Sequence, residues 1–207
     1  MNTKLSIALL TVAGFALPAQ ALTTFTLNQS VALGAGTFGM VTLTQDGANA
    51  VDVSVVLSDG YRFVETGSHD PFTFNLPNLT GYTVSNIVAT KDSGTTGPVL
   101  PYLASSNGAN PSYGSYTDKL ACATCGNGAS KSFADALSFQ VNLSGLNETN
   151  FKANALGYFF SADLIQLSTG TTGAVAAISA VPEPESYAML LAGLAAVAFV
   201  AKRRSAA

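Results

Sequence analysis

Hydrophobic and polar residues alternate along most of the chain between residues 25 and 167. The clearest run places Val51, Val53, Val55 and Leu57 on one side of an extended segment. A period of two is typical of a β-strand that buries one face and exposes the other. Further alternating runs lie at residues 25–27, 38–43, 61–63, 72–76, 82–87, 137–143 and 158–167.

Turn signals containing glycine separate these runs, at a spacing of about 8–12 residues. Short alternating strands with frequent turns are typical of antiparallel sheets that cover a core on one face. The pattern therefore predicts an all-β domain, either an antiparallel β-sandwich or a jelly-roll-like fold. The turn signals are Asp46-Gly47, Asp59-Gly60, Thr66-Gly67, Gly94, Ser144-Gly145 and Gly170.

Two segments depart from this pattern. Residues 94–128 are rich in Gly, Pro, Ser and Asn and contain few apolar residues, so they predict a long surface loop. Residues 132–137 allow two interpretations, a strand or a short helix capped by Ser130 or Ser132.

The folded domain is expected to span residues 22–170, which is enough for one domain with its own core. Residues 171–180 are predicted to be a linker, because they are rich in Gly, Thr and Ala. The wider segment 169–180 also allows a last strand before the linker.

Residues 1–21 have the parts of a secretory signal peptide. A short basic start and an apolar stretch precede Ala19-Gln20-Ala21, which is a small-x-small cleavage site. We therefore expect an exported mature chain that begins at Leu22.

Residues 181–207 combine a short Pro/Glu segment, an apolar span and a basic cluster, in that order. The apolar span, 187–201, has no charged residue and predicts a single transmembrane helix. Its helical rise of ~22 Å is shorter than the ~30 Å hydrocarbon core, so extension toward Val181 and snorkelling of basic side chains are needed. A buried core helix is the alternative, although such a helix would not end in a basic cluster. The cluster, expected on the cytoplasmic side, consists of Lys202, Arg203 and Arg204.

Pro182, Glu183 and Pro184, followed by the apolar span and Arg203-Arg204, resemble the PEP-CTERM sorting signal of Gram-negative bacteria. The resemblance implies processing by an exosortase, a membrane-embedded cysteine peptidase-like enzyme. It also implies export, transient anchoring in the inner membrane, cleavage near the motif, and release to the cell surface, the extracellular matrix or the medium. Such systems commonly accompany exopolysaccharide biosynthesis, so exopolysaccharide is a second implied partner.

The charge of the domain disfavours a nucleic-acid partner. Residues 22–180 contain five basic and ten acidic side chains, a formal net charge of −5. Nucleic acids and anionic membranes require basic patches. Charged residues are sparse, and Ser, Thr, Asn and Gly are abundant, as is typical of secreted β proteins.

Cys122 and Cys125 are the two cysteines of the chain. In an oxidising compartment this pair is expected to form a disulfide that closes a small loop. A redox motif would need a thioredoxin-like βαβ context, and a zinc site would need a second pair of ligands. Both alternatives stay open but lack these features.

The other candidates for chemistry are isolated. His69, the sole histidine, is expected to be a solvated loop residue, because no G-x-S-x-G motif accompanies it. Asp59, Asp70 and Asp163 lack the D-x-D-x-D spacing of a calcium loop. Glu65 and Asp70 have the residue types of a glycosidase pair, but sequence does not give their separation. We predict no catalytic residue, no metal site and no cofactor.

These observations predict an exported, non-catalytic surface or matrix protein. One alternative is a glycan-binding module that presents exposed tyrosines on the long loop, namely Tyr102, Tyr113 and Tyr116. The other is a polysaccharide-acting enzyme, which requires two carboxylates facing each other across a cleft.

Overall fold

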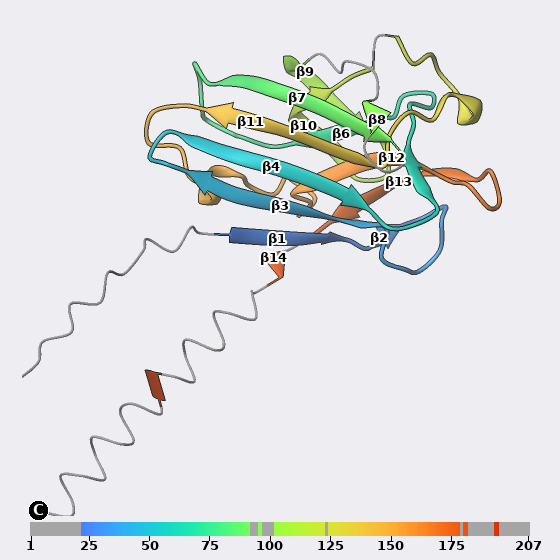
Figure 1. Cartoon of the computed structure of the whole chain (residues 1–207), viewed down its shortest axis with the longest axis horizontal. Coiled ribbons are helices and arrows are strands. Elements are labelled where there is room, and N and C mark those ends of the chain that lie inside the picture. Colours follow the sequence, from blue (N-terminus) through green and yellow to red (C-terminus); the bar gives the residue numbers. More distant parts are fainter. Residues whose placement is uncertain are drawn as a thin grey trace, which may run out of the picture.

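The computed structural model describes residues 22–91, 95–96, 102–122, 124–178, 180–181 and 193–194 (Figure 1). Within these residues two antiparallel β-sheets pack as a sandwich, so the predicted fold class is confirmed. The predicted signal peptide lies outside the described residues. So does the predicted transmembrane helix, apart from 193–194, which are helical. In the described part of the chain, no helix is long and apolar enough to cross a membrane.

The first sheet, sheet A, has the strand order β14-β1-β3-β4-β11-β7-β8, and Figure 1 looks onto it. The tight hairpin between β3 and β4 contains Gly47, whose φ of 63° suits glycine. The strands are β1 (Leu22–Leu27), β3 (Gly39–Asp46), β4 (Ala50–Leu57), β7 (Thr83–Lys91), β8 (Thr95–Thr96), β11 (Ala136–Asn142) and β14 (Ala180–Val181).

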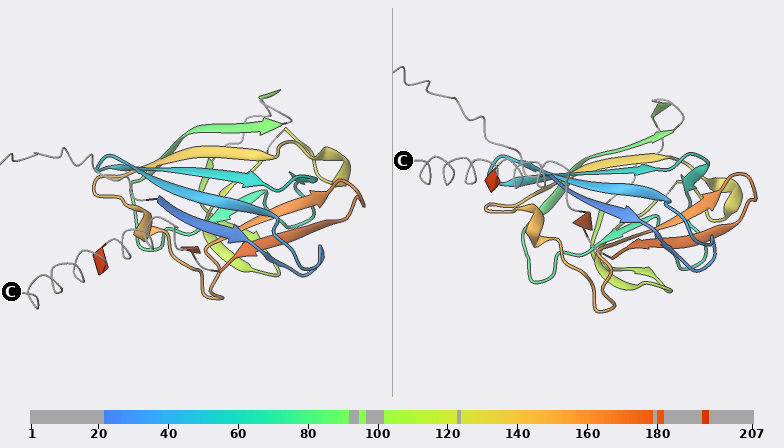
Figure 2. Two further views of the ribbon diagram at one scale, coloured as in Figure 1. Left: turned by 60° about the horizontal axis from the view of Figure 1, so that its bottom comes forward. Right: turned by 90° about the horizontal axis from the view of Figure 1, so that it is seen from below.

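The second sheet, sheet B, has the strand order β2-β13-β12-β6-β10-β9, and β5 pairs with β12 beside this path. Figure 2 shows the two sheets as separate layers. The strands are β2 (Gln29–Ser30), β5 (Tyr61–Phe63), β6 (Phe72–Phe74), β9 (Tyr102–Asn110), β10 (Gly114–Leu120), β12 (Phe160–Gln166) and β13 (Thr172–Ala177). Two 3₁₀ turns, η1 (Ala129–Lys131) and η2 (Glu148–Asn150), lie in the connections.

Phenylalanines from both sheets fill the space between the layers. The ring of Phe139 on β11 lies 5.2 Å from that of Phe74 and 6.0 Å from that of Phe72, between centroids. Phe160 on β12 stacks on Phe72 at 5.9 Å. All four side chains are buried, and aromatic pairs at these separations stabilise beyond the area that they bury. The alternating run of β4 contributes Val51, Val53, Val55 and Leu57 to the same core.

The predicted surface loop at 94–128 is wrong in its larger part. Residues 102–110 and 114–120 form β9 and β10, a hairpin at the edge of sheet B. Tyr116 and Leu120 of β10 are buried, and these anchors are separated by polar residues that hid the strand in the sequence. Pairing with β6 also supplies the ladder hydrogen bonds that β10 needs.

The alternative of a short helix at 132–137 is also wrong. The η1 turn ends before Ser132, whose φ and ψ are those of extended chain. Ala134 then forms an isolated bridge with Phe63, and β11 starts at Ala136. Strand pairing with β4 and β7 on both sides therefore decides this segment.

In the segment predicted as a linker at 171–180, the alternative of a last strand is confirmed over residues 172–177. Residues 172–177 form β13, which pairs with β12 along its whole length. Its residues 173–177 are all buried, because small side chains fit close to neighbouring segments: a Cβ on Gly173 would lie 2.7 Å from Ala32 Cβ. Ala180 and Val181 then pair with Phe25 and Thr24 as β14, so the last residue before Pro182 belongs to sheet A.

Candidate functional site

The predicted sorting and membrane residues lie outside the described part of the chain. These are Pro182, Glu183 and Pro184, the basic cluster Lys202, Arg203 and Arg204, and the signal-cleavage residues Ala19 and Ala21. β14 ends immediately before this sorting segment.

Cys122 and Cys125 form a disulfide, with their Cα atoms 5.4 Å apart. Cys122 is buried in the core cluster, and its backbone N–H donates to Glu65 Oε2 at 3.3 Å. This disulfide therefore closes the chain directly after β10, next to the end of β5. The position is that of a structural cross-link rather than of an exposed thiol pair.

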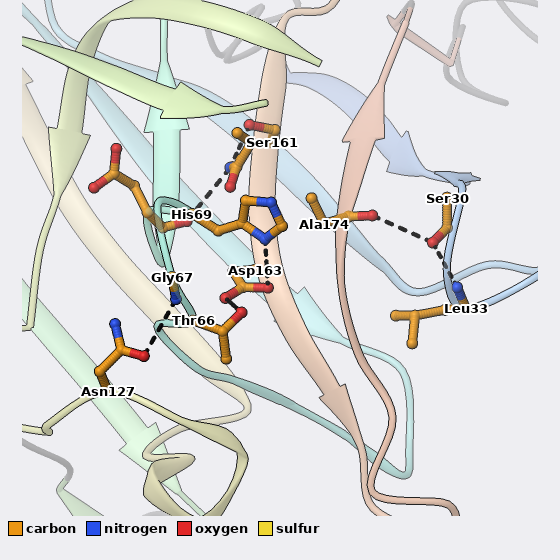
Figure 3. Close-up of polar contacts among 11 residues, drawn as sticks. Ser30, Leu33, Thr66, Gly67, His69, Asn127, Ser161, Asp163 and Ala174 are labelled. Atoms are coloured by element: carbon orange, nitrogen blue, oxygen red, sulfur yellow. Dashed lines mark hydrogen bonds and ion pairs between the residues drawn. The ribbon is translucent and has the colours of Figure 1, made fainter. Parts of the chain in front are cut away.

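His69 is not the solvated residue that we expected. A tight turn, closed by the His69 N–H on the Thr66 carbonyl at 3.0 Å, brings its ring onto the outer side of β12. Its Nδ1 lies 3.5 Å from Asp163 Oδ1, and its side chain is 26% exposed (Figure 3). The Thr66 hydroxyl donates to Asp163 Oδ2 at 2.6 Å. The connection between β5 and β6 folds back over sheet B, and this places Thr66 and His69 next to Asp163.

Burial determines the chemistry of Asp163, whose side chain is fully buried. Desolvation raises the pKa of this carboxyl group above its ordinary value, and the Thr66 hydrogen bond and the nearby His69 oppose that shift. Asp163 thus links the 66–69 turn to β12, although burial disfavours the charged form of its carboxyl group.

Ser161, two residues before Asp163, belongs to a second polar group on the same face of β12. Its Oγ lies 2.6 Å from Thr73 Oγ1 and accepts from Asn110 Nδ2 at 2.7 Å. Ser161, Thr73 and Asn110 are each 0% exposed. Their hydrogen bonds join three strands, β6, β9 and β12, and so hold sheet B together on its outer side.

Asp70 is engaged on both oxygens. Oδ2 accepts from the Ala109 N–H at 2.7 Å, and Oδ1 pairs with Lys119 Nζ at 2.9 Å. Since Glu65 accepts from Cys122, the two carboxylates named as a glycosidase pair serve separate structural contacts. The three aspartates considered for calcium have different partners: Asp70 pairs with Lys119 and Asp163 with His69, and Asp59 lies in a turn. In the described part of the chain, no group of three or more acidic, His or Cys side chains is arranged to hold a metal ion.

A pocket of about 400 Å³ opens at one end of sheet A. Three charged residues line it, Asp59, Arg62 and Asp135. The Asp59-Gly60 turn, in which Gly60 has a φ of 86°, forms one wall. The remaining lining residues are Val56, Leu57, Ser58, Tyr61, Ala136 and Leu167. The sequence indicated Asp59 only as a calcium ligand. Arg62 and Asp135 belong to no motif and lie far apart along the chain, so the sequence did not indicate that they line one pocket.

The tyrosines predicted for a glycan-binding loop do not form an exposed platform. Tyr113 and Tyr116 are each 3% exposed, and Tyr113 packs edge-on against Tyr158 with centroids 4.9 Å apart. Burial raises the pKa of both phenols above their ordinary value. The side chain of Tyr102 lies outside the described ones.

Residues 180–204 match the family model of the PEP-CTERM protein-sorting motif. The chain is thus a β-sandwich protein that carries a PEP-CTERM motif. This motif indicates a protein that is exported, held transiently in the membrane and sorted by an exosortase. The matched segment begins at Ala180, so it includes β14. No curated protein and no solved structure matches the chain.

Proposed function

We propose that the mature domain is a non-catalytic protein of the cell surface or extracellular matrix of a Gram-negative bacterium, associated with exopolysaccharide and biofilm. The observation that carries this proposal is the PEP-CTERM motif at 180–204, which overlaps the sandwich at β14. In this proposal residues 187–201 anchor the chain in the inner membrane until cleavage near Pro182–Pro184.

The non-catalytic part of the proposal is supported by the contacts of the buried polar residues. Ser161 is hydrogen-bonded to Thr73 and Asn110, and Asp70 to Lys119 and the Ala109 N–H. A nucleophile or general base must instead be accessible to a substrate. These side chains instead form hydrogen bonds and an ion pair that join neighbouring segments of sheet B.

A polysaccharide-acting enzyme is a second candidate, because Asp59 and Asp135 line one pocket and glycosidases use two carboxylates. Incubation of the protein with neutral polysaccharides and measurement of released reducing ends tests it. Release that is lost in an Asp59→Asn variant would overturn the non-catalytic proposal.

The sorting part is tested by the intact mass of the protein recovered from the cell surface and the medium, with and without the exosortase of the producing cell. We expect a chain that ends near Pro182–Pro184 only when the enzyme is present. Fractionation of the same cells should place the shortened chain with the extracellular matrix. A tail retained through Ala207 in both strains would indicate a plain membrane anchor and contradict the proposal.

A further inference from the structure

The outer face of sheet A and the pocket at its end form one continuous surface. We propose that this surface binds a neutral polysaccharide. The inference rests on the proposed matrix function and names the partner chemistry and the site. It uses four strands of sheet A, β1, β3, β4 and β11, together with the pocket around Asp59.

Hydroxyl groups cross the outer face of sheet A in register. Thr24 of β1 is opposite Thr42 of β3, Thr42 is opposite Ser54 of β4, and Ser54 is opposite Ser138 of β11. We call these four residues the hydroxyl row. Adjacent strands are ~4.8 Å apart, so the row presents a hydroxyl at each strand along a line perpendicular to the strands. Ser54 and Ser138, which are neighbours in this row, are exposed.

A second row beside it is apolar. Met40, Val56 and Ala136 are opposite one another on β3, β4 and β11. Met40 is 50% exposed and Val56 53% exposed. A pyranose ring has hydroxyls at its edge and C–H groups on its faces. Parallel hydroxyl and apolar rows therefore match the two kinds of surface that a sugar chain presents.

The charge on this face selects against acidic polymers. None of the residues in the two rows is charged, and the next row contains Asp52, which is opposite Gln140. Gln140 Nε2 donates to Asp52 Oδ1 at 2.9 Å and to Asp46 Oδ2 at 3.0 Å. No lysine or arginine in these rows faces the carboxylates of Asp52 and Asp46. These carboxylates therefore repel a uronic-acid polymer, but they do not repel a neutral polymer.

The apolar row leads directly into the pocket, because Val56 and Ala136 also line it. There the exposed Asp59 offers carboxylate acceptors, and Asp135 and Arg62 line the same cavity. Side chains of these types hydrogen-bond neighbouring hydroxyls of a sugar, and bonds to charged groups are stronger than bonds between neutral groups. The pocket volume of about 400 Å³ lies in the range of small-molecule sites. The pocket therefore holds one or two sugar units while the rows support the continuing chain.

Affinity electrophoresis of the processed protein from producing cells tests this inference, in gels that contain a neutral β-glucan, a neutral mannan or alginate. We expect retardation by at least one neutral polymer and none by alginate. The double variant Ser54→Lys and Ser138→Lys should bind at least about tenfold more weakly, since it blocks the hydroxyl row. Asp59→Ala should weaken binding through the pocket alone. Ser112→Lys, an equal substitution in the exposed β9–β10 turn, should bind as the unchanged protein does.

Thermal unfolding of each variant separates lost binding from lost folding. The inference is overturned if no neutral polymer retards the protein, if alginate binds best, or if the paired lysines leave retardation unchanged. It is also overturned if gel filtration shows a dimer that the paired lysines convert to a monomer, since a second copy of the chain would then cover this face. A protein that resides in the matrix but fails these binding tests would remove the polysaccharide site and leave the proposed matrix function intact.

Discussion

Asp163 is a fully buried carboxyl group beside the single histidine of the chain. The Thr66 hydroxyl donates a hydrogen bond to it, and the His69 ring lies beside it. At the scale of single residues, this site determines how the domain responds to pH. The phenylalanines between the sheets determine how much stability the domain loses when a core side chain is replaced by a smaller one.

We predict that Asp163→Asn reduces the pH dependence of stability. The folded pKa of Asp163 is raised above 3.8, so the native state binds more protons than the unfolded state between 3.8 and the folded pKa. Stability contributed by the neutral acid is therefore present at low pH and falls as pH rises through that window. Asparagine stays neutral and still accepts from Thr66. The measurement is the free energy of unfolding in denaturant from about pH 4 to about pH 7, with exposed Asp59→Asn as control. Parallel curves for Asp163→Asn and the unchanged protein would contradict this.

We predict that Phe139→Ala lowers the free energy of unfolding by about 3–5 kcal/mol, as large-to-small changes of buried aromatics do. Phe139 is 2% exposed and contacts the rings of Phe72 and Phe74 across the sandwich. Val31→Ala, at a side chain that is 78% exposed, should change it by no more than about 0.5 kcal/mol. Denaturant unfolding measures both. Equal effects of the two substitutions would argue against a core at this place.

At the scale of elements, the strands that alternate strongly could be predicted from sequence, and those built from small or polar residues could not. In β4, Val51, Val53 and Val55 are buried and the residues between them exposed, as the pattern predicted. β10 and β13 use Tyr, Leu, Gly and Ala at positions where pairing with a neighbouring strand, rather than hydrophobicity, decides the conformation.

The candidate site was less predictable than the strands, because its contacts join distant parts of the chain. Asn110 reaches Ser161 over 51 residues, and Thr66 reaches Asp163 over 97. Residues so far apart in the sequence belong to no common motif, so their contacts could not be predicted from spacing. The Asp59-Gly60 turn was predicted, but its closeness to Asp135 depends on how β5 and β11 are placed by the whole fold.

We predict that Gly39→Ala weakens the pairing of β3 with β4. A Cβ at this position would lie 2.6 Å from the Val56 carbonyl oxygen and 2.9 Å from Leu57 Cα, both backbone atoms that cannot turn away. The expected loss of stability is about 1–3 kcal/mol, as for other overpacked sites. Gly36→Ala is the matched control, because its Cβ would meet atoms only at 3.9 Å or beyond. A midpoint shift in thermal unfolding for Gly39→Ala alone is the expected result, and equal shifts would contradict it.

At the scale of the whole molecule, the sorting motif and the folded domain overlap, since 180–181 belong to both. A peptidase binds an extended segment, and folded segments are cleaved through their open state. We therefore predict that a flexible Gly-Ser segment inserted between Val181 and Pro182 speeds processing by the exosortase. Pulse labelling followed by gel separation of full-length and shortened chains measures the rate.

The control for this prediction carries the same insertion in the β3–β4 turn, between Gly47 and Ala48, where both residues are exposed. It should be processed at the rate of the unchanged chain. If the insertion before Pro182 leaves the rate unchanged or lowers it, pairing of β14 with β1 does not limit processing.

The pairing of β14 also determines how the domain bears force. Val181, the last residue of β14, is opposite Thr24 near the beginning of β1, and among the described residues one further pair, Ala180 with Phe25, precedes it. Tension on the chain beyond Val181, with the sandwich held in place, loads these two pairs one after the other rather than together. Strand pairs that open one at a time separate at low force. If the domain is tethered through residues beyond Val181 and flowing water pulls on it, β14 would separate from β1 first, and the tether would become longer by a few residues. The first mechanical response of the domain would then depend on these two pairs and not on the core of the sandwich.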